Sequence, residues 1–98
     1  MALALLFTPS SMTAEQYDEV IRQLETAGAG TPAGRRYHVC FGTGAHLRVL
    51  DVWESQEAFN AFGQTLMPIL QQVGVDPGQP EIAEVHNEIA EVHNIIVG

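Results

Sequence analysis

The sequence predicts an α+β domain whose strands and helices follow the order βαββαβ. The chain has 98 residues, of which 46% are hydrophobic, so it can bury one core but is too short for two domains. Residues 2–7 form a short apolar run, and two β-rich runs, 36–41 and 46–53, lie between two segments of helical periodicity. A β-rich segment near the C-terminus supplies the fourth strand. We therefore treat residues 1–98 as a single domain.

The first helix has a well-marked start at Thr13. Thr13 and Gln16 have the spacing of a capping box, in which each side chain bonds the other residue's backbone amide. Gly28 marks the end of the helix. Between them, apolar residues recur at i, i+3, i+4 and i+7, which predicts one buried stripe: Tyr17, Val20, Ile21 and Leu24.

The second helix is predicted to begin after Ser55, a good N-cap residue, and to end at Gly74. Pro68 interrupts this pattern, because proline lacks an amide proton and clashes with the preceding turn. We expect a kink or a restart of the helix there. The apolar residues that keep the helical period are Phe59, Phe62, Leu66, Ile69, Leu70 and Val73.

The two central β-rich runs predict an antiparallel hairpin with a loop of about four residues at 42–45. If Phe41 pairs with His46, then Arg36 lies opposite Asp51, where the two charges can pair. A different register would change these partners.

The alternation of side chains along a strand divides this hairpin into two faces. His38, Asp51 and Trp53 share one face. The other face is apolar, and we expect it to receive the two helices. It carries Tyr37, Val39, Phe41, Leu50 and Val52.

A seven-residue repeat lies near the C-terminus. The sequence Glu-Ile-Ala-Glu-Val-His-Asn occupies residues 81–87 and again residues 88–94. One copied heptad is too short to form a solenoid and indicates a tandem duplication, natural or engineered. The second copy runs directly into the β-rich residues 95–97, so we expect it to form the fourth strand. The first copy would then be displaced as a loop, an edge extension, a strand donated to a partner subunit, or a helix.

The charge balance argues against two classes of partner. Lysine is absent, and four arginines face twelve acidic residues, which gives a net charge of −8. This charge repels phosphate backbones and anionic lipid, so we expect no nucleic-acid partner and no membrane. Cys40 is the one cysteine, which is typical of a protein in the reducing cytoplasm. The apolar run at 2–7 is too short to span a bilayer.

Two segments carry a further signal: residues 8–17, which include Met-Thr-Ala-Glu-Gln-Tyr, and residues 52–59, which read Val-Trp-Glu-Ser-Gln-Glu-Ala-Phe. Together with the βαββαβ order, they resemble small proteins of the dimeric α+β barrel superfamily, and especially antibiotic biosynthesis monooxygenase-like domains. The resemblance implies a ferredoxin-like antiparallel sheet with both helices on one face, and a homodimer in which two sheets pack through their other faces into a barrel. It also implies that His38, Asp51 and Trp53 line the barrel interior, where such proteins keep their substrate pocket.

The sequence departs from the haem-degrading proteins of this superfamily. Trp53 matches their strand-end tryptophan, but Gly63 stands where they have a histidine, and residues 2–7 lack their asparagine. We therefore expect no haem chemistry and no other cofactor. Cofactor-free oxygenases of this fold act on aromatic polyketides, a substrate class that this sequence neither requires nor excludes.

His38 and Asp51 are the candidate catalytic residues, because an imidazole and a carboxylate on one enclosed face can serve as base and acid. Trp53, Arg36 and Val49 are the candidate substrate-binding residues on the same hairpin. The alternative is structural: Asp51 pairs with Arg36, and His38 is a hydrogen-bonded wall residue. Trp53 at a strand end can equally belong to the core.

The repeat does not predict a metal site. On a helix, His86 and His93 would stand about 10 Å apart along the axis, and on one continuous strand they would point to opposite faces. The sequence as a whole therefore predicts a dimeric protein that binds a small organic molecule, with cofactor-free oxygenation or isomerisation as its chemistry. The alternative is a non-enzymatic dimeric scaffold with a filled interior, in which the duplication alters strand register and assembly.

Overall fold

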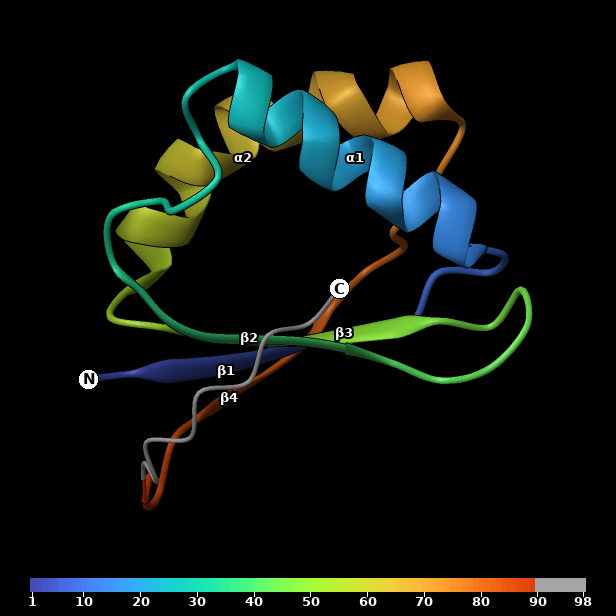
Figure 1. The fold of residues 1–98 in the computed structure, drawn as a ribbon. Coiled ribbons are helices and arrows are strands. Elements are labelled where there is room, and N and C mark those ends of the chain that lie inside the picture. The colour runs from blue at the N-terminus through green and yellow to red at the C-terminus, as the bar shows by residue number, and fades with distance from the viewer. Residues whose placement is uncertain (90–98) are drawn as a thin grey trace.

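Both helices lie on one face of a four-stranded antiparallel sheet (Figure 1). The computed structural model describes residues 1–89. The strand order is β2-β3-β1-β4, which confirms the predicted ferredoxin-like α+β class. Among the described residues, no helix is long and apolar enough to cross a membrane. The elements are β1 (Leu3–Phe7), α1 (Ala14–Thr26), β2 (Arg35–Phe41), β3 (Arg48–Trp53), α2 (Gln56–Val73) and β4 (Glu81–Glu84).

The capping box predicted for α1 is present. The Gln16 amide donates to the Thr13 hydroxyl oxygen at 3.1 Å, and the Thr13 amide donates to the Gln16 side-chain oxygen at 3.0 Å. These two bonds satisfy amides that have no partner within the helix. The helix is therefore fixed at its first turn, and this position sets where Tyr17 meets the sheet.

Helix α2 also begins and ends where the sequence predicts. The Ser55 hydroxyl accepts from the Ala58 amide at 3.1 Å, and Gly74 ends the helix with a left-handed φ of 88°. The helix is unbroken through Pro68, so the expected restart does not occur. Pro68 and Gln64 are both exposed, so the Gln64 carbonyl that loses its helical partner can bond to water instead.

The register of the hairpin differs from the predicted one by two residues. Phe41 pairs with Arg48, and His38 pairs with Asp51. The predicted contact between Arg36 and Asp51 is therefore wrong. A shift of two residues leaves each side chain on its original face, so His38 and Asp51 still share one face.

The longer hairpin loop accounts for this shift. It spans residues 42–47, and β3 begins at Arg48 rather than at 46. The backbone of Met12, just before α1, binds this loop: its amide donates to the Ala45 carbonyl at 2.8 Å, and its carbonyl accepts from the Leu47 amide at 3.3 Å. These bonds to a distant part of the chain cannot be read from the local sequence.

A β-bulge at the start of β2 changes which arginine faces the helices. Arg35 pairs with Trp53 and Tyr37 pairs with Val52, so Arg36 is the extra residue between them. Without the bulge, strict alternation would put Arg36 on the helix side. With it, Arg35 takes that place.

The helices cover the face opposite to the one we expected. Trp53 is fully buried, with its ring centroid 5.6 Å from that of Phe59 and 5.3 Å from that of Phe62 on α2. Asp51, on the same face, is 5% exposed. Tyr37, on the face predicted to receive the helices, is 51% exposed. The predictions that this second face packs on the helices, and that the His38, Asp51 and Trp53 face lines a barrel interior, are both wrong.

The apolar residues of β1 explain this choice of face. Leu5 pairs with Asp51 and is fully buried, and Leu3 and Phe7 pack against the same core. These side chains, together with Trp53, make the helix side more apolar than the hairpin alone suggests. Burial of apolar area, which contributes about 25 cal/mol per Å², therefore favours this side.

The first copy of the repeat forms β4, at the free edge of β1. Ala83 pairs with Ala4, and Ile82 pairs with Leu5. Our expectation that this copy is displaced from the sheet is wrong, because only the short connector after α2 precedes it and it is the first β-rich segment to reach that edge. The prediction that the second copy forms a strand falls mostly on residues 90–94, which lie outside the described residues.

Candidate functional site

A chain of hydrogen bonds joins four side chains between the sheet and α1. The Tyr17 hydroxyl lies 2.6 Å from His38 Nε2, and His38 Nδ1 lies 2.6 Å from Asp51 Oδ1. The other carboxylate oxygen of Asp51 accepts from the Trp53 indole N–H at 3.2 Å. The rings of Tyr17 and His38 stack with an interplanar angle of 12°. Both oxygens of the buried carboxylate are thus in use.

This chain fixes the tautomer of His38 when its ring is neutral. An ionised carboxylate can only accept hydrogen bonds, so Nδ1 of His38 must carry the proton that faces Asp51. Nε2 then has a free lone pair and accepts from the Tyr17 hydroxyl. The arrangement makes Nε2 the basic atom of the site, with its partner ring nitrogen held by a carboxylate.

Tyr17 remains a proton donor over the neutral pH range. Burial raises the pKa of its hydroxyl to about 12, and the neighbouring Cys40 acts in the same direction. The positive charge of Arg35 acts in the opposite direction. Burial also raises the pKa of the Cys40 thiol, which favours its predicted role as a small apolar side chain.

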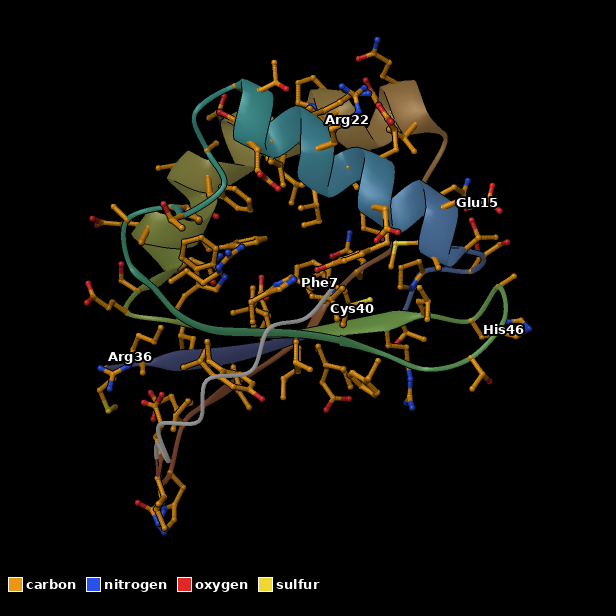
Figure 2. The ribbon with its side chains drawn as sticks, viewed as in Figure 1. Phe7, Glu15, Arg22, Arg36, Cys40 and His46 are labelled. Atoms are coloured by element: carbon orange, nitrogen blue, oxygen red, sulfur yellow. The ribbon has the colours of Figure 1, made fainter. Side chains whose placement is uncertain are left out.

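A cavity of about 90 Å³ lies between the helices and the sheet, at this hydrogen-bonded chain. One water molecule needs a cavity of only about 10–15 Å³, so this cavity can hold more than a single water. Its walls come from both helices and from β1, β2 and β3, and Figure 2 shows Phe7 and Cys40 on the helix side of the sheet. Its wall is largely apolar, and the polar side chains in it are Tyr17, Arg35, His38 and Asp51.

The structure brings together three of the five predicted site residues. His38, Asp51 and Val49 line the cavity. Trp53 does not line the cavity; it is a core residue that donates a hydrogen bond to Asp51. Arg36, labelled in Figure 2, does not line the cavity. Its guanidinium pairs with the Glu88 carboxylate at 2.9 Å.

Two polar residues of the site were missed by reasoning from the sequence. Tyr17 was assigned to the apolar stripe of the first helix, although a buried tyrosine hydroxyl usually needs a hydrogen-bond partner. The presence of a tyrosine in a stripe predicted to be buried was therefore the signal that a polar partner lies nearby. Arg35 was missed because its position depends on the bulge, which carries no clear sequence signal. Among residues 1–89, no three or more metal-ligating side chains gather into a metal site.

Comparisons with known proteins identify the fold. No protein-family model matches the chain, and no curated protein sequence matches it. Solved structures do match. A candidate antibiotic biosynthesis monooxygenase from Chloroflexus aurantiacus has a TM-score of 0.65 at 15% identity, over 92% of this chain and 98% of its own. SnoaB, a cofactor-independent oxygenase from Streptomyces nogalater, has a TM-score of 0.62 at 14% identity, over 92% and 96%.

A third match shows the same arrangement. Rv0793 from Mycobacterium tuberculosis has a TM-score of 0.55 at 15% identity, over 91% of this chain and 97% of its own. At such identities the likeness is one of fold, since unrelated chemistries share this architecture. The chain thus has the ferredoxin-like fold that is found in antibiotic biosynthesis monooxygenase-like proteins.

Proposed function

We propose that this protein binds a small, largely apolar organic molecule between its helices and its sheet and removes a proton from it with His38. One observation carries the proposal: the basic nitrogen of a His38–Asp51 pair stands in the wall of an apolar cavity. An apolar pocket with a few convergent polar groups is the usual form of a small-molecule site.

The chemistry begins with a ligand that carries an acidic C–H or O–H group. The ligand takes the place of the Tyr17 hydroxyl at His38 Nε2, and Nε2 accepts the proton while Asp51 stabilises the imidazolium that forms. The ligand keeps the electron pair as an enolate or phenolate. Return of the proton to another carbon gives isomerisation. Attack of the carbanion carbon on O₂ instead forms a C–O bond, and the proton held by His38 completes a hydroperoxide. Loss of water from this hydroperoxide leaves a new carbonyl, which is the product of cofactor-free oxygenation. Both reactions share this first step.

The shared fold supports the oxygenation branch by analogy, because SnoaB is described as a cofactor-independent oxygenase. We further propose a homodimer that packs through the open face of the sheet, where Tyr37 is half exposed. We also propose a cytoplasmic location, on the basis of the single cysteine.

Hydrogen exchange at carbon tests the proposal without knowledge of the final product. The probe is 2-tetralone, a bicyclic ketone with an acidic C–H beside its carbonyl, and the readout is the loss of that proton signal in D₂O by ¹H NMR. We expect the protein to accelerate the exchange with saturation kinetics. The His38→Gln variant should lose the acceleration, because it removes the base.

The His46→Gln variant is the matched control, since His46 lies exposed in the hairpin loop and lines no part of the cavity. It should exchange the probe at the wild-type rate. Equal rates for the two variants, or a rate that never saturates with ketone, would show only catalysis by surface imidazoles. That result would favour the alternative, a dimeric scaffold with no catalytic site.

A further inference from the structure

We propose that Arg35 binds the ligand oxygen on which negative charge develops, so that the cavity selects neutral carbonyl compounds and phenols. This inference rests on the proposed function and names its substrate class. A positive charge held beside an oxygen that becomes negative lowers the free energy of forming that oxyanion, because its hydrogen-bond donors are already in position.

The β-bulge places Arg35 in the cavity wall. Arg35 lies opposite Trp53 on the helix side, and its guanidinium carbon stands 5.9 Å from the centroid of the Phe62 ring, which also lines the cavity. One guanidinium nitrogen donates to the Gly30 carbonyl at 3.2 Å. The side chain is thus held between the cavity and the loop that precedes β2.

Among the described residues, one hydrogen bond occupies the Arg35 guanidinium, which leaves most of its donors for a ligand. A guanidinium has five N–H donors, and the hydrogen bonds among residues 1–89 use one of them, the bond to Gly30. Arg35 forms no ion pair with any carboxylate in this part of the chain, whereas Arg22 and Arg36 both do. Asp51, the carboxylate of the cavity, is already bonded to two side chains.

The charges around Arg35 favour a ligand that is neutral when it enters. The net charge of −8 repels anions from the surface, and the buried Asp51 repels them at the site. A neutral ketone or phenol avoids both costs. Once His38 takes its proton, the ligand oxygen becomes negative while the imidazole becomes positive, and Arg35 and the Tyr17 hydroxyl are the donors lining the cavity nearby.

The probe for this inference is 4-nitrophenol, whose phenolate absorbs visible light. The absorbance of the bound compound, measured as a function of pH, gives the fraction that is ionised and hence the pKa of the bound phenol. We expect this pKa to be about one unit higher in the Arg35→Gln variant than in the wild-type protein, because a cation a few ångströms away shifts a pKa by about 1–3 units. Nitrobenzene, which has no acidic hydroxyl, should bind both proteins equally.

Arg36→Gln is the matched control, because the same change at the neighbouring bulge residue lies outside the cavity. It should leave the bound pKa at the wild-type value. Equal pKa values of the bound phenol in the Arg35→Gln and wild-type proteins would overturn the inference. Arg35 would then have only a structural role, as the donor of the hydrogen bond to the Gly30 carbonyl. Failure of both 4-nitrophenol and nitrobenzene to bind the wild-type protein would instead overturn the proposed cavity function itself.

The wild-type protein supplies a second test that does not depend on the variant folding. The dissociation constant for 4-nitrophenol should rise as pH rises through the pKa of the free phenol, because the net charge of −8 and the buried Asp51 disfavour entry of the phenolate. Tighter binding of the free phenolate than of the neutral phenol would contradict the selection of neutral ligands.

Discussion

The Asp51→Asn variant is expected to slow the exchange of 2-tetralone about 10²- to 10⁴-fold. The Trp53 indole N–H needs an acceptor, so the asparagine oxygen must face Trp53 and its NH₂ group must face His38. An NH₂ group can only donate, which forces Nδ1 of His38 to accept and moves the ring proton to Nε2. The basic nitrogen then carries a proton and cannot take one from the ligand.

The matched control is Asp18→Asn, the same chemical change at an exposed position of α1. It should leave the exchange rate unchanged. The tautomer itself can be read from the ¹⁵N chemical shifts of the His38 ring. In the wild-type protein Nδ1 should show the shift of a protonated nitrogen, and in Asp51→Asn Nε2 should show it instead. A wild-type exchange rate in Asp51→Asn would mean that the tautomer of His38 has no part in the reaction.

The Trp53→Ala variant is expected to lose about 3–5 kcal/mol of unfolding free energy in urea denaturation. Trp53 is fully buried, and its ring packs against Phe59 and Phe62 of α2, so its truncation leaves a cavity in the core. Its loss also leaves one oxygen of the buried Asp51 without a donor.

The control for this variant is Tyr37→Ala, an aromatic truncation on the other face of the sheet. Tyr37 is 51% exposed, so its loss should cost about 1 kcal/mol or less in the monomer. Both variants should be measured at low protein concentration, so that dimerisation does not contribute to the measured free energy of unfolding. If Trp53→Ala were no more destabilising than Tyr37→Ala, the placement of the helices on the Trp53 face would be wrong.

The features of the fold that could be predicted are those set by local chemistry. Capping by Thr13 and Ser55 and the left-handed end at Gly74 depend on residues within one turn, and all three are confirmed. The grouping of His38 with Asp51 also held, because it depends only on the alternation of side chains along a strand.

The features that could not be predicted depend on contacts between distant segments. Which face of the hairpin meets the helices was decided by the apolar side chains of β1, and the register by backbone bonds from Met12 to the hairpin loop. Simple alternation would put Arg36 on the helix side of β2, but the bulge at Arg36 puts Arg35 there instead. The pairing of His38 with Asp51 on one face was therefore predictable from the sequence, whereas the cavity and the position of Arg35 were not.

The location of a bound ligand tests the central claim most directly. In an isotope-filtered NOE experiment on the labelled protein with 2-tetralone, the ring protons of the ligand should show contacts to methyl groups of Val20, Leu66 and Leu70, which line the cavity between the helices and the sheet. Contacts to Val39 and Leu50 on the open face of the sheet would place the ligand elsewhere and contradict the account.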